Sequence, residues 1–183
     1  MENIIREEAK KLGCEYATFR AIVEVEGAGK GFDQRTGKIL IQFEPHWFRR
    51  LYPNWRAKST GYAWSTNKVE TQPGEWKAFN SAFAINKDAA MQSTSIGAMQ
   101  IMGFHYKRLG FKTVGDMWDY AKVSEANQIR LGAMFIKTDN TLLKAVQEKN
   151  WPTIARIYNG AGYKRYNYDN RLKSAYIKHS KNN

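Results

Sequence analysis

The stretch Phe19-Arg20-Ala21-Ile22-Val23-Glu24-Val25-Glu26-Gly27 combines the pattern of a buried helix with an acidic end. Apolar residues recur at the spacing of one helical face, at Ala17, Ala21 and Val25. Gly27, with Gly29 and Gly31 close behind it, predicts that the helix ends here. The sequence thus predicts an apolar helix that presents a carboxylate on its last turn, beside a glycine-rich loop.

The position of Glu26 predicts an unusual acid. Burial raises the pKa of a carboxyl group, and the partial negative charge at a helix C-terminus acts in the same direction. A carboxylic acid that keeps its proton near neutral pH can donate it to a substrate. Glu24 lies two residues earlier and is predicted to point to another side of the helix. The alternative is that both glutamates are ordinary solvated charges.

The size and composition of the chain fit one globular domain over residues 1–183. The 183 residues can enclose a sizeable core, and the hydrophobic content of 43% excludes a disordered chain. The net charge of +12 predicts attraction to polyanions, such as nucleic acid, anionic lipid head groups or a negatively charged cell envelope. Charge alone does not choose among these partners.

Several other classes of protein are disfavoured. No run of about 18 apolar residues is present, so we expect no transmembrane helix. The charged segment from Met1 to Glu8 lacks the hydrophobic core of a signal peptide and predicts synthesis and folding in a cytoplasm. Cys14 is the single cysteine and the three histidines lie far apart, so we predict neither a metal site nor a cofactor.

Helical periodicity dominates most of the chain. Thr113 has capping-box spacing to Asp116 before another helix. The segment from Ser95 to Gly103 is predicted to lead into a helix that reaches about Leu109. The other predicted helices, besides the one that ends at Glu26, lie near residues 4–12, 75–85, 87–92, 124–137, 142–146, 154–158 and 169–179.

Period-two alternation marks one exception to the helical pattern. Ile39, Ile41 and Phe43 alternate with Leu40, Gln42 and Glu44 after a predicted turn at residues 33–38. This period of two indicates a small β-hairpin with a better defined second strand. Glu44 shares a strand face with Gln42. Residues 45–75 are predicted to be irregular and carry many aromatic side chains. These either pack in a core or line a groove where flat sugar faces or bases stack.

Three motifs now stand in order along the chain. They are Ala21-Ile-Val-Glu-Val-Glu-Gly27, Ser95-Ile-Gly-Ala-Met-Gln-Ile-Met-Gly103 and Tyr158-Asn-Gly-Ala-Gly162. This order resembles the lysozyme superfamily, in its goose-type lysozyme and lytic transglycosylase branch. The N-acetylmuramidase domain of bacteriophage endolysins is the more similar family, over nearly the whole chain from Ala21 to Tyr176. That likeness includes Gly31-Phe32, Ile41-Gln-Phe-Glu-Pro-His-Trp-Phe48 and Tyr168-Asp169.

The resemblance implies a mainly α (α+β lysozyme-like) fold, with one small β-hairpin beside an active-site cleft, forming a single catalytic domain. It implies hydrolysis of the β-1,4 bond between N-acetylmuramic acid and N-acetylglucosamine in peptidoglycan. Such hydrolysis uses an acid and commonly a second carboxylate. Glu26 is the predicted acid and Glu44, across the cleft, the predicted second carboxylate, with Asp33 as the alternative. The positions that match substrate-binding motif residues are Ser95, Gln100, Tyr158 and Asn159.

The chain departs from the family pattern at several positions. Gln92-Ser93 stands where Glu-Ser is usual, Ile96 where an aromatic residue is usual, and Pro45 where an arginine is usual. These departures concern substrate contacts more than the acid. They bear on the preferred sugar or cell wall rather than on the chemistry.

Two other functions are weighed against the muramidase. A lytic transglycosylase would need only Glu26 and would form 1,6-anhydro products. A basic nucleic-acid-binding protein is disfavoured because its recognition motifs are missing and the cations are dispersed. We expect a monomer whose partner is peptidoglycan rather than nucleic acid. It would stay in the host cytoplasm until released to the cell wall or periplasm.

The last predicted helix adds a partner hypothesis. Leu172, Ala175 and Tyr176 share one face, while four cations lie largely off that face or beyond it: Arg171, Lys173, Lys178 and Lys181. A basic amphipathic helix can contact an anionic outer envelope. The alternative is that the apolar face packs on the domain and the cations are solvated.

Overall fold

The structure is a computed structural model that describes residues 1–27, 30–58, 63–66 and 71–181. The chain divides into two compact units: unit 1 contains Met1–Gly29 and Ile129–Asn183, and unit 2 contains Lys30–Gln128. The second boundary falls inside one continuous helix, α7 (Glu125–Lys137). The expectation of a single catalytic domain over residues 1–183 stays a prediction.

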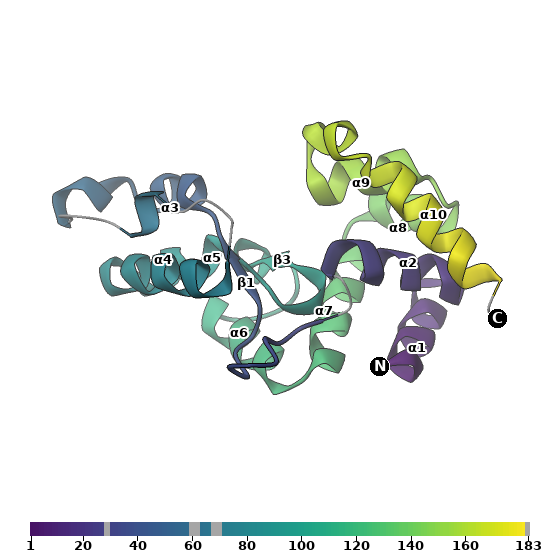
Figure 1. Ribbon diagram of the computed structural model, residues 1–183, viewed down its shortest axis with the longest axis horizontal. Coiled ribbons are helices and arrows are strands. Elements are labelled where there is room, and N and C mark those ends of the chain that lie inside the picture. The colour runs from purple at the N-terminus through teal and green to yellow at the C-terminus, as the bar shows by residue number, and fades with distance from the viewer. Residues whose placement is uncertain (28–29, 59–62, 67–70, 182–183) are drawn as a thin grey trace. The chain divides into compact units, whose positions relative to one another are not determined.

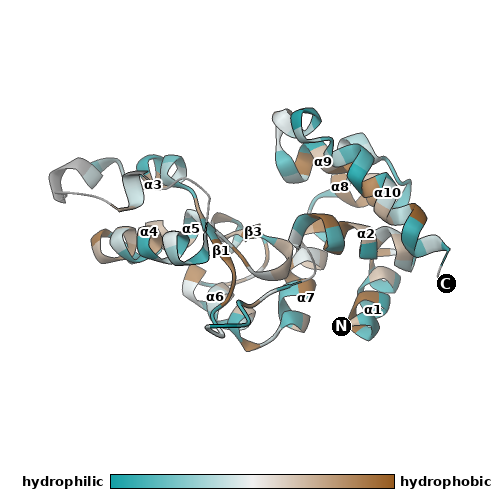
Figure 2. Ribbon diagram, in the orientation of Figure 1, coloured by the Kyte–Doolittle hydropathy of each residue, from teal (hydrophilic) through white to brown (hydrophobic). Residues whose placement is uncertain are grey.

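Unit 1 is helical. Gly13 ends the first helix, because its φ of 67° lets its N–H reach the carbonyls of Ala9 and Lys10. Figure 2 shows brown and teal residues alternating around α1 and α10, the pattern of amphipathic helices. Besides its part of α7, the elements of the unit are α1 (Glu2–Leu12), α2 (Tyr16–Gly27), α8 (Asn140–Gln147), α9 (Trp151–Asn159), η5 (Ala161–Tyr166) and α10 (Tyr168–Ser180).

The core of unit 1 joins the two ends of its chain. Helix α10 packs on α2 and α9, so the purple α2 and the yellow α10 lie side by side (Figure 1). Phe19, Ile22 and Leu172 are fully buried. Burial of one such side chain contributes about 1.5–3 kcal/mol. The apolar face of α10 is thus used for packing, as the alternative interpretation of the last helix had it.

Unit 2 contains a three-stranded antiparallel sheet in the order β1 (Ile41–Phe43), β2 (Thr94–Ile96) and β3 (Ile101–Met102). Gln42 faces Ser95, which in turn faces Met102. The predicted turn at 33–38 forms, and an isolated bridge joins Phe32 to Ile39. The ladder partner of β1 is nevertheless β2, which lies far along the chain. The predicted mainly α fold with a small sheet is confirmed. The strand that pairs with β1 is β2, however, and not the segment before the turn, as a hairpin would require.

The segment from residue 95 to residue 103 corrects a prediction. It was expected to lead into a helix but forms β2, the turn η3 (Gly97–Met99) and β3. Gly97 and Gln100 have positive φ values of 70° and 47°, which a regular right-handed helix does not admit. A following turn, η4 (Gly103–His105), replaces the predicted helix up to Leu109.

The outer edge of β1 is covered by side chains of α4 (Gln72–Ile85). The amide of Gln72 accepts from the N–H of Ile41 at 3.0 Å and donates to its carbonyl at 2.8 Å. Oε2 of the buried Glu75 accepts from the N–H of Phe43 at 2.7 Å. These bonds satisfy the backbone groups that an edge strand leaves open. Helix α4 begins before the predicted residue 75 because Thr71 caps its first turn.

Within the segment 45–75, the described residues (45–58, 63–66 and 71–75) are less irregular than predicted. They contain α3 (Pro45–Leu51), η1 (Pro53–Lys58) and η2 (Trp64–Thr66), and Pro45 suits the first turn of α3. Trp64 is fully buried, and its ring lies 5.0 Å from that of Phe48. Of the two predicted alternatives for the aromatic residues, packing in a core therefore applies to this pair. Trp47 is half-buried against Phe104. Tyr62, another aromatic residue of this segment, lies outside the described residues.

Unit 2 contains two further helices besides its part of α7. The helix α5 (Lys87–Gln92) has the predicted bounds, and α6 (Val114–Val123) begins with the predicted capping box of Thr113 and Asp116. The helices of the described residues include none with the length and apolar content needed to cross a membrane.

Candidate active site

Glu26 lies on the last turn of α2 in unit 1, as the sequence predicts. Its side chain is half-buried, and Oε1 accepts a hydrogen bond from Nδ2 of Asn159 at 3.1 Å. Burial raises the pKa of Glu26 to about 7, against the smaller lowering effects of the Asn159 hydrogen bond and the Arg171 charge. The group is therefore a carboxylic acid that is still partly protonated at neutral pH.

Asn159 reaches Glu26 because α9 ends at this residue. Gly160 follows with a φ of 74°, a left-handed conformation that glycine adopts without strain. Tyr158 is half-buried, and its ring lies 5.1 Å from that of Phe135. In this motif, Asn159 thus supplies a polar contact to the acid. The preceding residue, Tyr158, supplies a packed aromatic side chain.

Glu24 lies apart from this arrangement, as its position on the helix predicts. Its Oε2 lies 2.7 Å from Nε2 of His179, and Lys178 donates to the same carboxylate at 3.1 Å. Burial acts to raise the pKa of Glu24, but the bonds from His179 and Lys178 outweigh it and hold the pKa below its ordinary value. The two glutamates of α2 therefore have opposite protonation behaviour.

Glu44 belongs to unit 2 and lies just after β1, not on the strand where the sequence pattern predicted it. Strand β1 ends at Phe43, and Glu44 is the extended residue that precedes α3, because Pro45 starts that helix. Gln42 Nε2 donates to Glu44 Oε1 at 3.0 Å, and His46 Nδ1 lies 3.3 Å from Oε2. The predicted proximity of Gln42 and Glu44 is thus present.

Ser95 and Gln100 lie together in unit 2. The hydroxyl of Ser95 donates to Oε1 of Gln100 at 2.8 Å, and the Gln100 amide donates to the carbonyl of Gly97 at 2.9 Å. Ser95 is the ladder partner of Gln42, whose side chain holds Glu44. Gln100 has a φ of 47°, an uncommon value for a residue other than glycine that is concentrated at functional sites.

Asp33, the alternative second carboxylate, accepts hydrogen bonds from the backbone of the turn in which it lies. Its Oδ1 accepts from the N–H groups of Arg35 and Thr36, both at 2.9 Å. The hydrogen bonds from the backbone of Thr36 and then of Arg35 hold the pKa of Asp33 below its ordinary value. Glu44 rather than Asp33 is linked to other predicted site residues within unit 2.

Some neighbours of these groups were not among the predicted site residues. Gln42 and His46 contact Glu44, and Arg171 acts on Glu26 through its charge. The shared strand face of Gln42 and Glu44 was a signal for the first of these. The influence of Arg171 on Glu26 had no local signal, because it comes from a helix near the other end of the chain.

The predicted site residues thus form two sets. Glu26, Tyr158 and Asn159 lie in unit 1, whereas Glu44, Ser95 and Gln100 lie in unit 2. The carboxyl separation of Glu26 and Glu44 stays a prediction. Over the parts of the chain that the structure describes, no three His, Cys, Asp or Glu side chains gather as metal ligands. The acid that the geometry provides can carry out proton transfer by itself.

This acid and fold define an enzyme of the lysozyme type. The N-acetylmuramidase family matches residues 15–180, and the chain belongs to that family. It is therefore a glycoside hydrolase that acts on peptidoglycan. The resemblance carried by the three motifs is confirmed.

A solved structure supports the same assignment. The chain is similar to the crystal structure of a Burkholderia AP3 phage endolysin, with a TM-score of 0.86 and 33% sequence identity. The match covers 99% of this chain and 70% of that endolysin. Among curated proteins, none matches this sequence.

Proposed function

We propose that this muramidase is a phage endolysin in which Glu26 protonates the leaving oxygen of the β-1,4 bond between N-acetylmuramic acid and N-acetylglucosamine. The observation that carries the proposal is the Glu26 carboxyl, with its pKa raised to about 7 by burial. The phage endolysin found among solved structures supports the biological role. In this role the enzyme is made in the host cytoplasm and acts when it is released to the cell wall.

The hydrogen bond from Asn159 determines which carboxyl oxygen of Glu26 carries the proton. Because Oε1 accepts the Asn159 hydrogen bond, the proton is favoured on Oε2, which is then the donating oxygen. The transition state develops positive charge at the sugar carbon while the leaving oxygen takes up this proton. Tyr158 in unit 1, and Ser95 and Gln100 in unit 2, supply the phenol, hydroxyl and amide groups that would hold sugar hydroxyl and N-acetyl groups.

Glu44 is proposed as the second carboxylate. Its bond from Gln42 and its proximity to His46 hold the group at the start of α3. In retaining and inverting glycosidases the two carboxyl groups lie roughly 5–9.5 Å apart. A measured structure with bound saccharide should show this separation from Glu26. If Asp33 occupied that place instead, the role would pass to Asp33.

A lytic transglycosylase is retained as the second candidate. Within α2, Glu24 is directed to His179 and Lys178, so Glu26 is the glutamate of that helix available for a single-acid mechanism. Mass spectrometry of the products distinguishes the reactions. Reducing ends indicate hydrolysis, and 1,6-anhydro ends indicate attack by the 6-hydroxyl of the sugar.

Substitution of Glu26 tests the central assignment. Glu26→Gln keeps the shape and removes the proton donor, so lysis of purified peptidoglycan should fall by about 10²- to 10⁴-fold. Glu24→Gln, two residues away on the same helix, is the matched control and should retain most activity. Circular dichroism should show that both variants are folded. A Glu26→Gln enzyme with more than about a tenth of wild-type activity would refute the role of Glu26.

The envelope contact of the C-terminal helix is a separate part of the proposal. All four cations are exposed, but Lys178 pairs with Glu24 and the Arg171 guanidinium lies 4.7 Å from the Tyr168 ring centroid, so Lys173 and Lys181 are the pair to test. Because the apolar face is packed, the contact would be electrostatic. Replacing Lys173 and Lys181 by Gln should lower the killing of intact cells and leave digestion of purified peptidoglycan unchanged. Unchanged killing would contradict it.

The oligomeric state belongs to the same proposal. A monomer is expected, in line with the solvation of a chain with a net charge of +12. Light scattering coupled to size-exclusion chromatography should give the mass of one chain. A dimer mass at micromolar concentration would contradict this expectation.

A further inference from the structure

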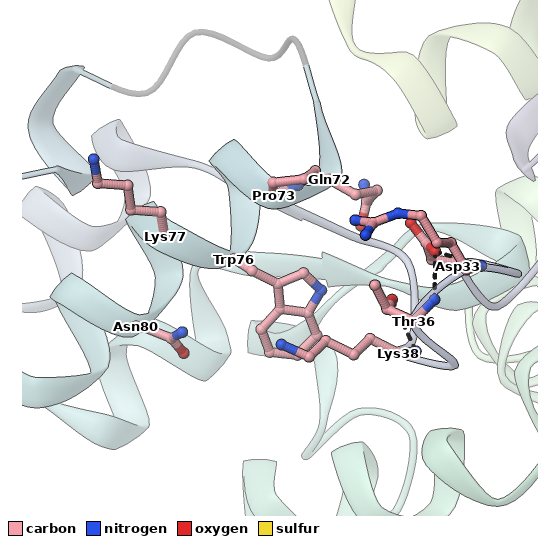
Figure 3. Close-up of a pocket in the computed structure, with 9 residues that line it drawn as sticks. Asp33, Thr36, Lys38, Gln72, Pro73, Trp76, Lys77 and Asn80 are labelled. Carbon is pink, nitrogen blue, oxygen red and sulfur yellow. Dashed lines mark hydrogen bonds between the residues drawn. The ribbon is translucent and has the colours of Figure 1, made fainter.

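A pocket of about 440 Å³ lies in unit 2, between the turn at 33–38 and the first turns of α4 (Figure 3). It is distinct from the cluster of Glu44, Ser95 and Gln100, none of which lines it. The lining residues used in the argument are Asp33, Arg35, Lys38, Trp76, Lys77 and Asn80.

Trp76 and Lys38 form one wall of the pocket. The Lys38 ammonium lies 5.2 Å from the centroid of the indole ring, and Figure 3 shows the Lys38 side chain beside that ring. The rings of Phe79 and Trp118 meet the indole nearly at right angles, at 5.5 and 6.4 Å. The pocket therefore has a packed apolar wall with a cation held beside it.

The charge of the lining is positive. Arg35, Lys38 and Lys77 supply three cations, against the single carboxylate of Asp33. That carboxylate already accepts two backbone hydrogen bonds at 2.9 Å within the turn. Figure 3 shows Lys77 extending away from Trp76, so Arg35 and Lys38 are the cations of interest. The pocket suits an anion that also carries apolar groups.

We propose that this pocket binds a carboxylate on the peptide side chains of peptidoglycan. The inference rests on the proposed function, because those peptides branch from the glycan that the enzyme cleaves. Arg35 and Lys38 would bind the carboxylate, since guanidinium and ammonium groups form charge-assisted hydrogen bonds with it. Trp76 would contact the small alkyl side chains, and the exposed amide of Asn80 would bond to a peptide group. The pocket thus favours glycan that still bears its peptides.

Binding is tested on the Glu26→Gln protein with muramyl dipeptide, a soluble probe that contains a sugar, two residues and a free carboxylate. The indole N–H signal of Trp76 in ¹⁵N NMR, assigned from its loss in Trp76→Phe, should shift in a saturable way. Adding Arg35→Gln and Lys38→Gln should weaken binding by at least about tenfold, because the loss of even one charge-assisted hydrogen bond accounts for that factor. Lys107→Gln with Lys112→Gln removes the same charge from exposed positions of unit 2 and should leave binding unchanged.

Kinetics provide the second measurement. With Glu26 intact, the Arg35→Gln/Lys38→Gln enzyme should show a several-fold higher KM on peptide-bearing peptidoglycan and an unchanged kcat. On glycan strands stripped of peptides by an amidase, both constants should equal those of the wild type. The Lys107→Gln/Lys112→Gln enzyme should match the wild type on both substrates.

Three results would overturn the assignment: no saturable shift at Trp76, an equal effect of the control pair, or an equal response to inorganic phosphate. The last would mark a general anion site. The binding measurement needs no cleavage, so the two proposals fail separately. A wild-type enzyme that does not cleave peptidoglycan refutes the proposed function, whereas cleavage without the Trp76 response refutes only the peptide site.

Discussion

The proton on Glu26 links the stability of the protein to pH. The pKa is 4.5 for an ordinary glutamate and about 7 for Glu26 in the folded protein. Below pH 4.5 both the folded and unfolded states hold the proton, so the group has no effect on stability. As pH rises to about 7, the unfolded state loses the proton more readily, and the free energy of unfolding falls.

Glu26→Gln should therefore stabilise the enzyme that it inactivates. A neutral amide avoids the cost of a buried carboxylate, which reaches at most about 3 kcal/mol above pH 7 for a shift of this size. Chemical denaturation at pH 8 and pH 4 measures the difference. The gain should be present at pH 8 and nearly absent at pH 4. A gain that is equal at both values would point to packing rather than to the proton.

The same pKa sets the alkaline limit of activity. Because only protonated Glu26 can donate, kcat/KM should fall as pH rises through about 7. Asn159 stabilises the carboxylate, so Asn159→Ala should move this limb to higher pH as well as lower the maximal rate. Glu24→Gln should leave the limb in place. A limb that does not respond to Asn159→Ala would separate the pH dependence from Glu26.

At the scale of the elements, Gln128 connects η3, the turn between β2 and β3, to the helices of unit 2. It is 1% exposed, accepts from the N–H of Ala98 at 2.8 Å and donates to the carbonyl of Ala121 at 3.0 Å. A Cβ at Gly97 would lie 2.6 Å from Cδ of Gln128. The glutamine thus occupies the space that the glycine leaves open and supports the turn before Gln100.

Gln128→Ala should destabilise the protein by about 2 kcal/mol or more, because it leaves a buried N–H and a buried carbonyl without partners. Thermal unfolding followed by circular dichroism measures the loss. Gln34→Ala in the exposed turn is the control and should change the melting temperature little. A neutral Gln128→Ala would mean that water replaces both bonds.

Local signals explain how far the sequence predicted the elements. The caps at Gly13 and Thr113 and the helical period of α10 act over a few residues, so those helices were predicted closely. The pairing of β1 with β2 depends on residues distant in sequence, and no local pattern revealed it. Glu26 was predictable from its helix, whereas its bond to Asn159 spans 133 positions and was not predicted, since the motifs marked Asn159 only as a substrate-binding position.

At the scale of the whole molecule, the net charge of +12 should govern attachment to an anionic wall. Raising the ionic strength from about 0.01 to 1 M shortens the screening length from about 30 to about 3 Å. The fraction of Glu26→Gln protein that sediments with insoluble peptidoglycan should fall steeply over this range. Cleavage of a short neutral oligosaccharide by the wild-type enzyme should change much less. Salt-independent sedimentation would show that contacts other than charge hold the protein on the wall.

The packing of α10 against α2 also has a consequence for biosynthesis. A ribosome delivers α2 early and α10 late, with the whole of unit 2 emerging between them. Domains generally fold as they emerge. Unit 2 can therefore collapse while α2 still waits for its covering helix. The burial that raises the pKa of Glu26 is completed only after α10 has left the exit tunnel. A nascent chain without α10 should thus lack the burial that keeps a proton on Glu26 near neutral pH.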